Sequence, residues 1–93
     1  MSEYEKKKVE VEEKIKNVTA YIKNLKNQIE RNTQSLLKCR RGTLKGMDSC
    51  GYYDGMEVIL QGKLTKAEEN LRHQKAKLRV LNIKIERANI LKF

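Results

Sequence analysis

Apolar residues recur in alternating steps of three and four between Tyr4 and Cys39. The first seam position holds Lys8, Ile15, Ile22, Ile29 and Leu36, and the second holds Tyr4, Val11, Val18, Leu25, Asn32 and Cys39. A seam sustained over about five heptads is typical of a coiled-coil strand. This stretch is therefore predicted to form one long helix.

The same pattern returns in the C-terminal part of the chain. One seam position there holds Leu64, Leu71, Leu78 and Ile85, and the other holds Leu60, Ala67, Gln74, Leu81 and Ala88. Two seams of matched length can fold back on each other, and the seam amides Asn32 and Gln74 penalise wrong registers. We therefore predict an all-α fold, an antiparallel coiled-coil helical hairpin.

Capping residues and glycines predict where the helices begin and end. Ser2 followed by Glu5 matches a capping box, and Asp54 followed by Glu57 repeats the spacing. Four glycines at positions 42, 46, 51 and 55 indicate a connector. The expected elements are a helix over about 2–41, a connector over about 42–55 and a second helix over about 55–92, within a single domain of residues 1–93.

The seams also suggest a register for the hairpin. Pairing residues whose numbers add to 96 places Ile29 opposite Ala67 and Val11 opposite Ile85. A shift of one heptad would also keep the seams facing each other, so both registers stay open.

A second apolar stripe lies beside the seam of the C-terminal helix. It consists of Ala76, Val80, Ile83 and Ile90, at steps of four, three and seven. Apolar positions on two faces of a helix need partners on two faces. We expect the stripe to pack against a second copy, giving a dimeric four-helix arrangement, or against a partner helix. The alternative is a set of isolated exposed aliphatic residues.

Positive charge is shared by both helical arms. The net charge is +9, and the excess of Lys and Arg over Asp and Glu is +4 for residues 1–40 and +5 for residues 56–93. Such a balance favours nucleic acid, an acidic protein groove or an anionic membrane surface as partner. A solvated lysine-rich surface is the alternative.

The sequence offers no arrangement typical of an enzyme. It has no nucleophile beside a base, no paired carboxylates in a plausible cleft and no phosphate-binding loop. His73 is the only histidine, so Cys39 and Cys50 do not predict a zinc site. We expect a non-enzymatic protein without metal or cofactor.

Neither a secretory signal nor a transmembrane segment is indicated, because no long uninterrupted apolar stretch occurs. We therefore expect a cytoplasmic protein, in which cysteines are usually reduced. On this interpretation Cys39 is a seam residue and Cys50 a loop thiol, and a disulfide between them after oxidation is the alternative.

Two side-chain clusters in the connector region are candidate binding residues. Tyr52 and Tyr53 combine large area with polar edges, which suits a partner-binding patch, although they can also simply close the end of the coil. The basic residues of the same region are Arg40, Arg41 and Lys45. They are the candidate nucleic-acid contacts, since cations beside aromatic rings suit single strands.

Two functional hypotheses follow. The first is a coiled-coil interaction or assembly protein, an adaptor or small subunit of a larger complex, and a homodimer is expected. The second is a small basic nucleic-acid-binding hairpin dimer. In layout the chain resembles the RNA-binding hairpin dimers of plasmid copy control, whose connector is shorter. It also resembles the coiled-coil stalks of flagellar and type III export ATPases, through a tyrosine-bearing connector followed by a long polar helix.

Overall fold

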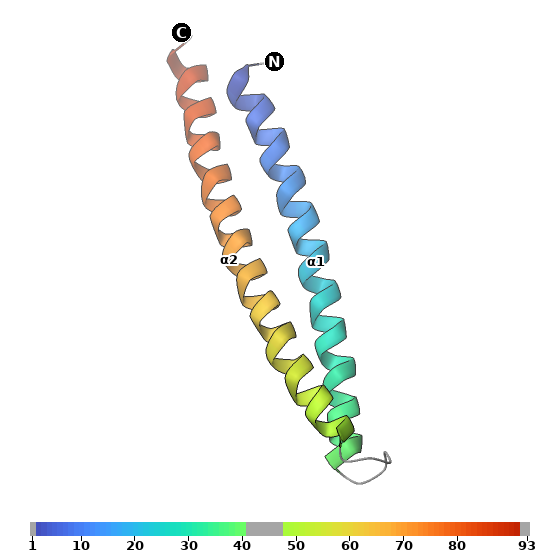
Figure 1. Cartoon of the computed structure of the whole chain (residues 1–93). Coiled ribbons are helices and arrows are strands. Elements are labelled where there is room, and N and C mark those ends of the chain that lie inside the picture. The colour runs from blue at the N-terminus through green and yellow to red at the C-terminus, as the bar shows by residue number, and fades with distance from the viewer. Residues whose placement is uncertain (1, 41–47, 92–93) are drawn as a thin grey trace. The chain divides into compact units, whose positions relative to one another are not determined.

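The protein is all-α and consists of two long helices packed antiparallel as a helical hairpin (Figure 1). The computed structural model describes residues 2–40 and 48–91. Helix α1 spans Glu3–Arg40 and helix α2 spans Asp48–Leu91. The prediction of an all-α helical hairpin is confirmed.

The hairpin divides into two compact units, each built from one stretch of both helices. Unit 1 comprises Met1–Ala20 and Glu68–Phe93, and unit 2 comprises Tyr21–Ala67. This division leaves the expectation of a single domain untested.

The predicted capping box forms at the start of α1. The Ser2 hydroxyl accepts the backbone N–H of Glu5 at 3.2 Å, and the Glu5 carboxylate accepts the backbone N–H of Ser2 at 3.4 Å. The backbone carbonyl of Ser2 also accepts the N–H of Lys6 at 3.1 Å. The two side-chain bonds satisfy N–H groups that have no backbone partner at the start of a helix, and the bond from Lys6 is the first backbone bond of the helix.

Helix α2 begins at Asp48, not near Gly55 as predicted. Gly51 and Gly55 are therefore helical, and Asp54 lies inside the helix, where its carboxylate accepts a hydrogen bond from Arg40. A glycine in a helix costs only about 1 kcal/mol, and packing of the adjacent turns against α1 offsets this cost. The expected end of the first helix at about residue 41 and the expected start of the connector at about residue 42 lie outside the described residues.

In both units the predicted seam forms the least exposed face of each helix. In unit 2 the most buried side chains are Leu25 and Leu60, with 2% and 4% of their surface exposed. In unit 1, Val11, Gln74 and Leu81 are buried in the same way. The remaining seam positions are half-buried or buried, except Tyr4 at the start of α1. The heptad pattern thus identified the buried face of each helix.

The register is the one-heptad alternative to the pairing that adds to 96. In unit 2, the bonded pairs Cys39–Cys50 and Asn32–Glu57 both have numbers that add to 89. In unit 1, the ammonium of Lys84 lies 5.7 Å from the ring centre of Tyr4. The numbers of these two residues add to 88, close to the sum found in unit 2. The earlier start of α2 explains the shift, because it moves the midpoint of the connection toward the N-terminus.

We predict that Gly62→Ala raises the free energy of unfolding by about 0.5–1 kcal/mol. Gly62 lies inside α2, is exposed, and a Cβ added there meets no atom within 4 Å. Urea unfolding followed by circular dichroism measures the change. Lys63→Ala on the next, exposed position is the control and should change stability by less than about 0.5 kcal/mol. A loss of stability in Gly62→Ala would contradict the prediction.

Candidate interaction site

The second apolar stripe of α2 is exposed in unit 1. Val80, Ile83 and Ile90 have 50%, 42% and 64% of their surface accessible, and Ala76 is exposed as well. Neighbouring residues of the same helix, Leu81 among them, are buried against α1. The hairpin's own core therefore leaves this row of aliphatic side chains uncovered.

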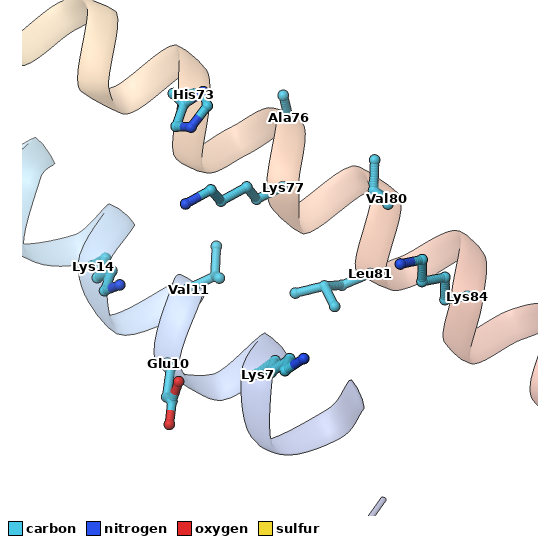
Figure 2. A pocket seen from close by; sticks show the side chains of 10 residues that line it. All are labelled: Lys7, Glu10, Val11, Lys14, His73, Ala76, Lys77, Val80, Leu81 and Lys84. Atoms are coloured by element: carbon cyan, nitrogen blue, oxygen red, sulfur yellow. The ribbon is translucent and has the colours of Figure 1, made fainter. Parts of the chain in front are cut away.

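Part of the stripe borders an open groove between the two helices of unit 1 (Figure 2). The groove has a volume of about 530 Å³. Its lining is Lys7, Glu10, Val11 and Lys14 from α1, and His73, Ala76, Lys77, Val80, Leu81 and Lys84 from α2. Val11 and Leu81 point toward each other at its floor, as Figure 2 shows. Ala76 and Val80 belong to both the groove and the stripe.

Lysines border the groove on both helices at heptad spacing. On α1 they are Lys7 and Lys14, and on α2 they are Lys77 and Lys84. Seven residues correspond to about 10.5 Å along a helix. In Figure 2 the Lys77 side chain extends toward α1, whereas the carboxylate of Glu10 points away from α2. The groove thus combines an apolar floor with a positively charged rim.

Two of the rim lysines make weak contacts within unit 1. Lys7 forms an exposed ion pair with Glu3 at 3.5 Å, one turn away on the same helix. Lys84 lies over the ring of Tyr4. Exposed interactions of these kinds are worth about 1 kcal/mol or less, so they do not prevent the lysines from meeting a partner.

Sequence reasoning identified the stripe and missed the groove. The lysines were interpreted only as general positive charge, although their seven-residue spacing on both helices was visible in the sequence. The sequence pattern does not specify the register of the two helices. Only the register places Lys14 and Lys77 beside the same groove.

The tyrosines of the predicted contact patch have different environments in unit 2. Tyr52 is 63% exposed, whereas Tyr53 is half-buried, and their rings meet edge to face at 5.3 Å. Both line a shallow hollow of about 290 Å³ together with Gln28, Arg31, Asn32, Ser35, Met56 and Leu60. The structure brings the two tyrosines together, and Tyr52 is the more accessible of the pair.

The predicted basic cluster is described only in part. Arg40 donates to the carboxylate of Asp54 at 3.1 Å, so a neighbouring acid compensates its charge. Arg41 and Lys45 lie outside the described residues.

Cys39 and Cys50 form a disulfide, which corrects the interpretation of both as reduced thiols. Their Cα atoms are 5.7 Å apart, a separation usual for this bond. Because α2 starts at Asp48, Cys50 is part of that helix rather than of a loop, and the register places it opposite Cys39. The bond ties the end of α1 to the first turn of α2 inside unit 2.

A buried amide connects the two helices near this bond. The side-chain amide of Asn32 donates to the backbone carbonyl of Tyr53 at 2.9 Å and to the carboxylate of Glu57 at 3.0 Å. Asn32 and then Gln61 lower the pKa of Glu57 by donating hydrogen bonds to its charged form. This network favours the observed register, since a one-heptad shift would leave Asn32 without these partners.

The other seam amide, Gln74 in unit 1, is less well satisfied. Its amide group donates to Asn70 at 3.3 Å, while its buried oxygen has no hydrogen-bond partner among the described residues. The polar pair in unit 2 therefore specifies the register more strongly than Gln74 does.

We predict that Glu57→Gln lowers the free energy of unfolding by up to about 1 kcal/mol at pH 7, because an ionised acceptor makes the stronger hydrogen bond. The pKa of Glu57 lies below its ordinary value of 4.5 in the folded chain. The advantage of the wild type is therefore complete above about pH 4.5 and declines as the pH falls through the lower folded-state pKa.

Urea unfolding at pH 7 and pH 3 tests this prediction. Exposed Glu30→Gln is the control and should show no such pH-dependent difference. An equal gap between wild type and Glu57→Gln at both pH values would contradict it.

Among residues 2–40 and 48–91, no three His, Cys, Asp or Glu side chains form a group that could hold a metal ion. No described helix is both long and apolar enough to cross a membrane. Comparisons with known protein families, curated proteins and solved structures found no match to this chain. Its function is therefore inferred from the surfaces of the two units.

Proposed function

We propose that this chain is a non-enzymatic interaction protein, a helical hairpin that serves as an adaptor or small subunit of a larger complex. The exposed row Val80, Ile83 and Ile90 carries the proposal. These residues lie on a helix that already buries its seam against α1, so the row is available to another helix. Its helical spacing is what a partner helix would recognise.

The energetics support a specific but limited contact. Burying a Val or Ile side chain completely is worth about 1.5–3 kcal/mol, and these three are roughly half exposed. Covering them would contribute a few kcal/mol at most, before the loss of translational freedom is subtracted. Stable association therefore needs further contacts beside the row.

Two occupants fit this proposal. A second copy would give the dimeric four-helix arrangement expected from the sequence, and a helix of another protein would give a mixed bundle. The cytoplasm is the proposed location.

We expect the double variant Ile83→Glu, Ile90→Glu to remain helical but to lose association, because each glutamate places a charge in an apolar contact. Light scattering measures the mass, and circular dichroism checks the helices. The matched control is Val58→Glu, Ile59→Glu, which changes two exposed aliphatic residues of α2 in unit 2 and should leave the mass unchanged. Association that survives the stripe substitutions would exclude the stripe as the interface.

Nucleic-acid binding is the second candidate function, and the rim lysines of unit 1 together with the net charge of +9 favour it. If it is correct, a generic oligonucleotide should bind at low salt and weaken steeply as salt rises, because phosphate contacts release counterions. Titration followed by fluorescence anisotropy measures the slope. Binding that is absent at low salt would exclude this function. Arg40→Gln should have little effect, because Asp54 already compensates that charge.

A further inference from the structure

We propose that the groove of unit 1 bordered by Lys7, Lys14, Lys77 and Lys84 is a docking site for an acidic amphipathic helix of another protein. This inference rests on the proposed interaction function and deepens it by naming the chemistry of the partner. The apolar floor, the charged rim and the spacing of the rim each contribute to it.

The floor suits the apolar face of a helix. Val11 and Leu81 close the bottom between α1 and α2, and Ala76 and Val80 add apolar lining from α2, with side chains that point away from α1 in Figure 2. Ala76 and Val80 are one helical turn apart. Apolar residues one turn apart on an incoming helix would therefore lie beside them. A helix laid between two antiparallel helices buries its apolar face on both.

The rim selects the charge of that helix. Lysines border both sides and repeat every seven residues, Lys7 and Lys14 on α1 and Lys77 and Lys84 on α2. In a helix bundle the residues flanking the apolar seam also repeat every seven residues. A partner with Glu or Asp at both flanking positions would therefore meet lysines in successive heptads on both sides. Among the described residues of the lining, Glu10 is the only acid, and its carboxylate points away from α2.

The same rim disfavours a second copy as the occupant. In a twofold contact the same patch meets itself, so the four lysines of one protomer would face those of its partner. The copy would also bring its own net charge of +9. A nucleic acid would satisfy the lysines but would leave the aliphatic floor without an apolar partner. An acidic amphipathic helix satisfies both parts of the groove.

The test uses the full chain and three fluorescent peptides of three heptads each. All carry the same Leu and Ile seam, and their flanking positions are all Glu, all Gln or all Lys. Fluorescence anisotropy at low and high salt measures the Kd. We expect the Glu peptide to bind about tenfold more tightly than the Gln peptide at low salt, because several exposed charge pairs together would contribute a binding free energy of that size. The Lys peptide should bind most weakly, and salt should reduce the difference.

Substitutions of this chain locate the binding. Lys14→Gln with Lys77→Gln should weaken the Glu peptide about fivefold and leave the Gln peptide unchanged, because two exposed charge pairs are lost. Lys26→Gln with Lys63→Gln, exposed lysines of unit 2, is the matched control and should change neither. Val80→Asp should weaken both peptides. Val80 is exposed and outside the seam, so this change should leave the hairpin folded.

Each outcome supports or overturns the docking site. Equal affinity for the three peptides overturns it, as does a Glu preference unaffected by Lys14→Gln with Lys77→Gln. Binding of an oligonucleotide in place of any peptide also overturns it. If the chain ignores every peptide but associates with itself through Ile83 and Ile90, the docking site fails while the proposed function stands. If the stripe variant also leaves association unchanged, the proposed function fails as well.

Discussion

The packing of one heptad seam against another is the interaction on which the rest of the molecule depends. It fixes which face of each helix is buried, from Leu25 and Leu60 in unit 2 to Val11 and Leu81 in unit 1. Because α1 and α2 each use one face for this contact, every other apolar position is left to solvent or to a partner. The stripe of α2 is significant for this reason.

Hydrophobic packing alone does not select one register, because sliding by a heptad presents the same types of residue again. Polar and covalent contacts make the selection in unit 2. Asn32 reaches Tyr53 and Glu57 only in the observed register, and the bond between Cys39 and Cys50 forms in it too. A buried amide that loses its partners is penalised by its full desolvation, so this small network discriminates well between registers.

The two units differ in what they offer to a partner. In unit 2 the polar groups near the disulfide largely satisfy one another, as the Arg40–Asp54 pair and the Asn32 network show. In unit 1 the rim lysines and the stripe face outward, and part of the stripe forms one side of the groove. A surface that combines positive charge with exposed aliphatic side chains matches neither a purely solvated coil nor a simple phosphate-binding face. This combination is why we propose an acidic amphipathic helix as the partner.

The sequence by itself determined the all-α hairpin, the buried face of both helices, the start of α1 at its capping box and the stripe from Ala76 to Ile90. These features depend on local propensity and on periods of three and four residues, which the chain states directly. Only the tertiary structure decided the start of α2, the register, the disulfide and the groove. Each of these depends on which residue of one helix faces which residue of the other, and a repeating seam leaves that choice open by whole heptads. The glycines wrongly predicted a connector up to residue 55. The free-energy cost of placing Gly51 and Gly55 in a helix is local, whereas the contacts that offset this cost come from the opposite helix.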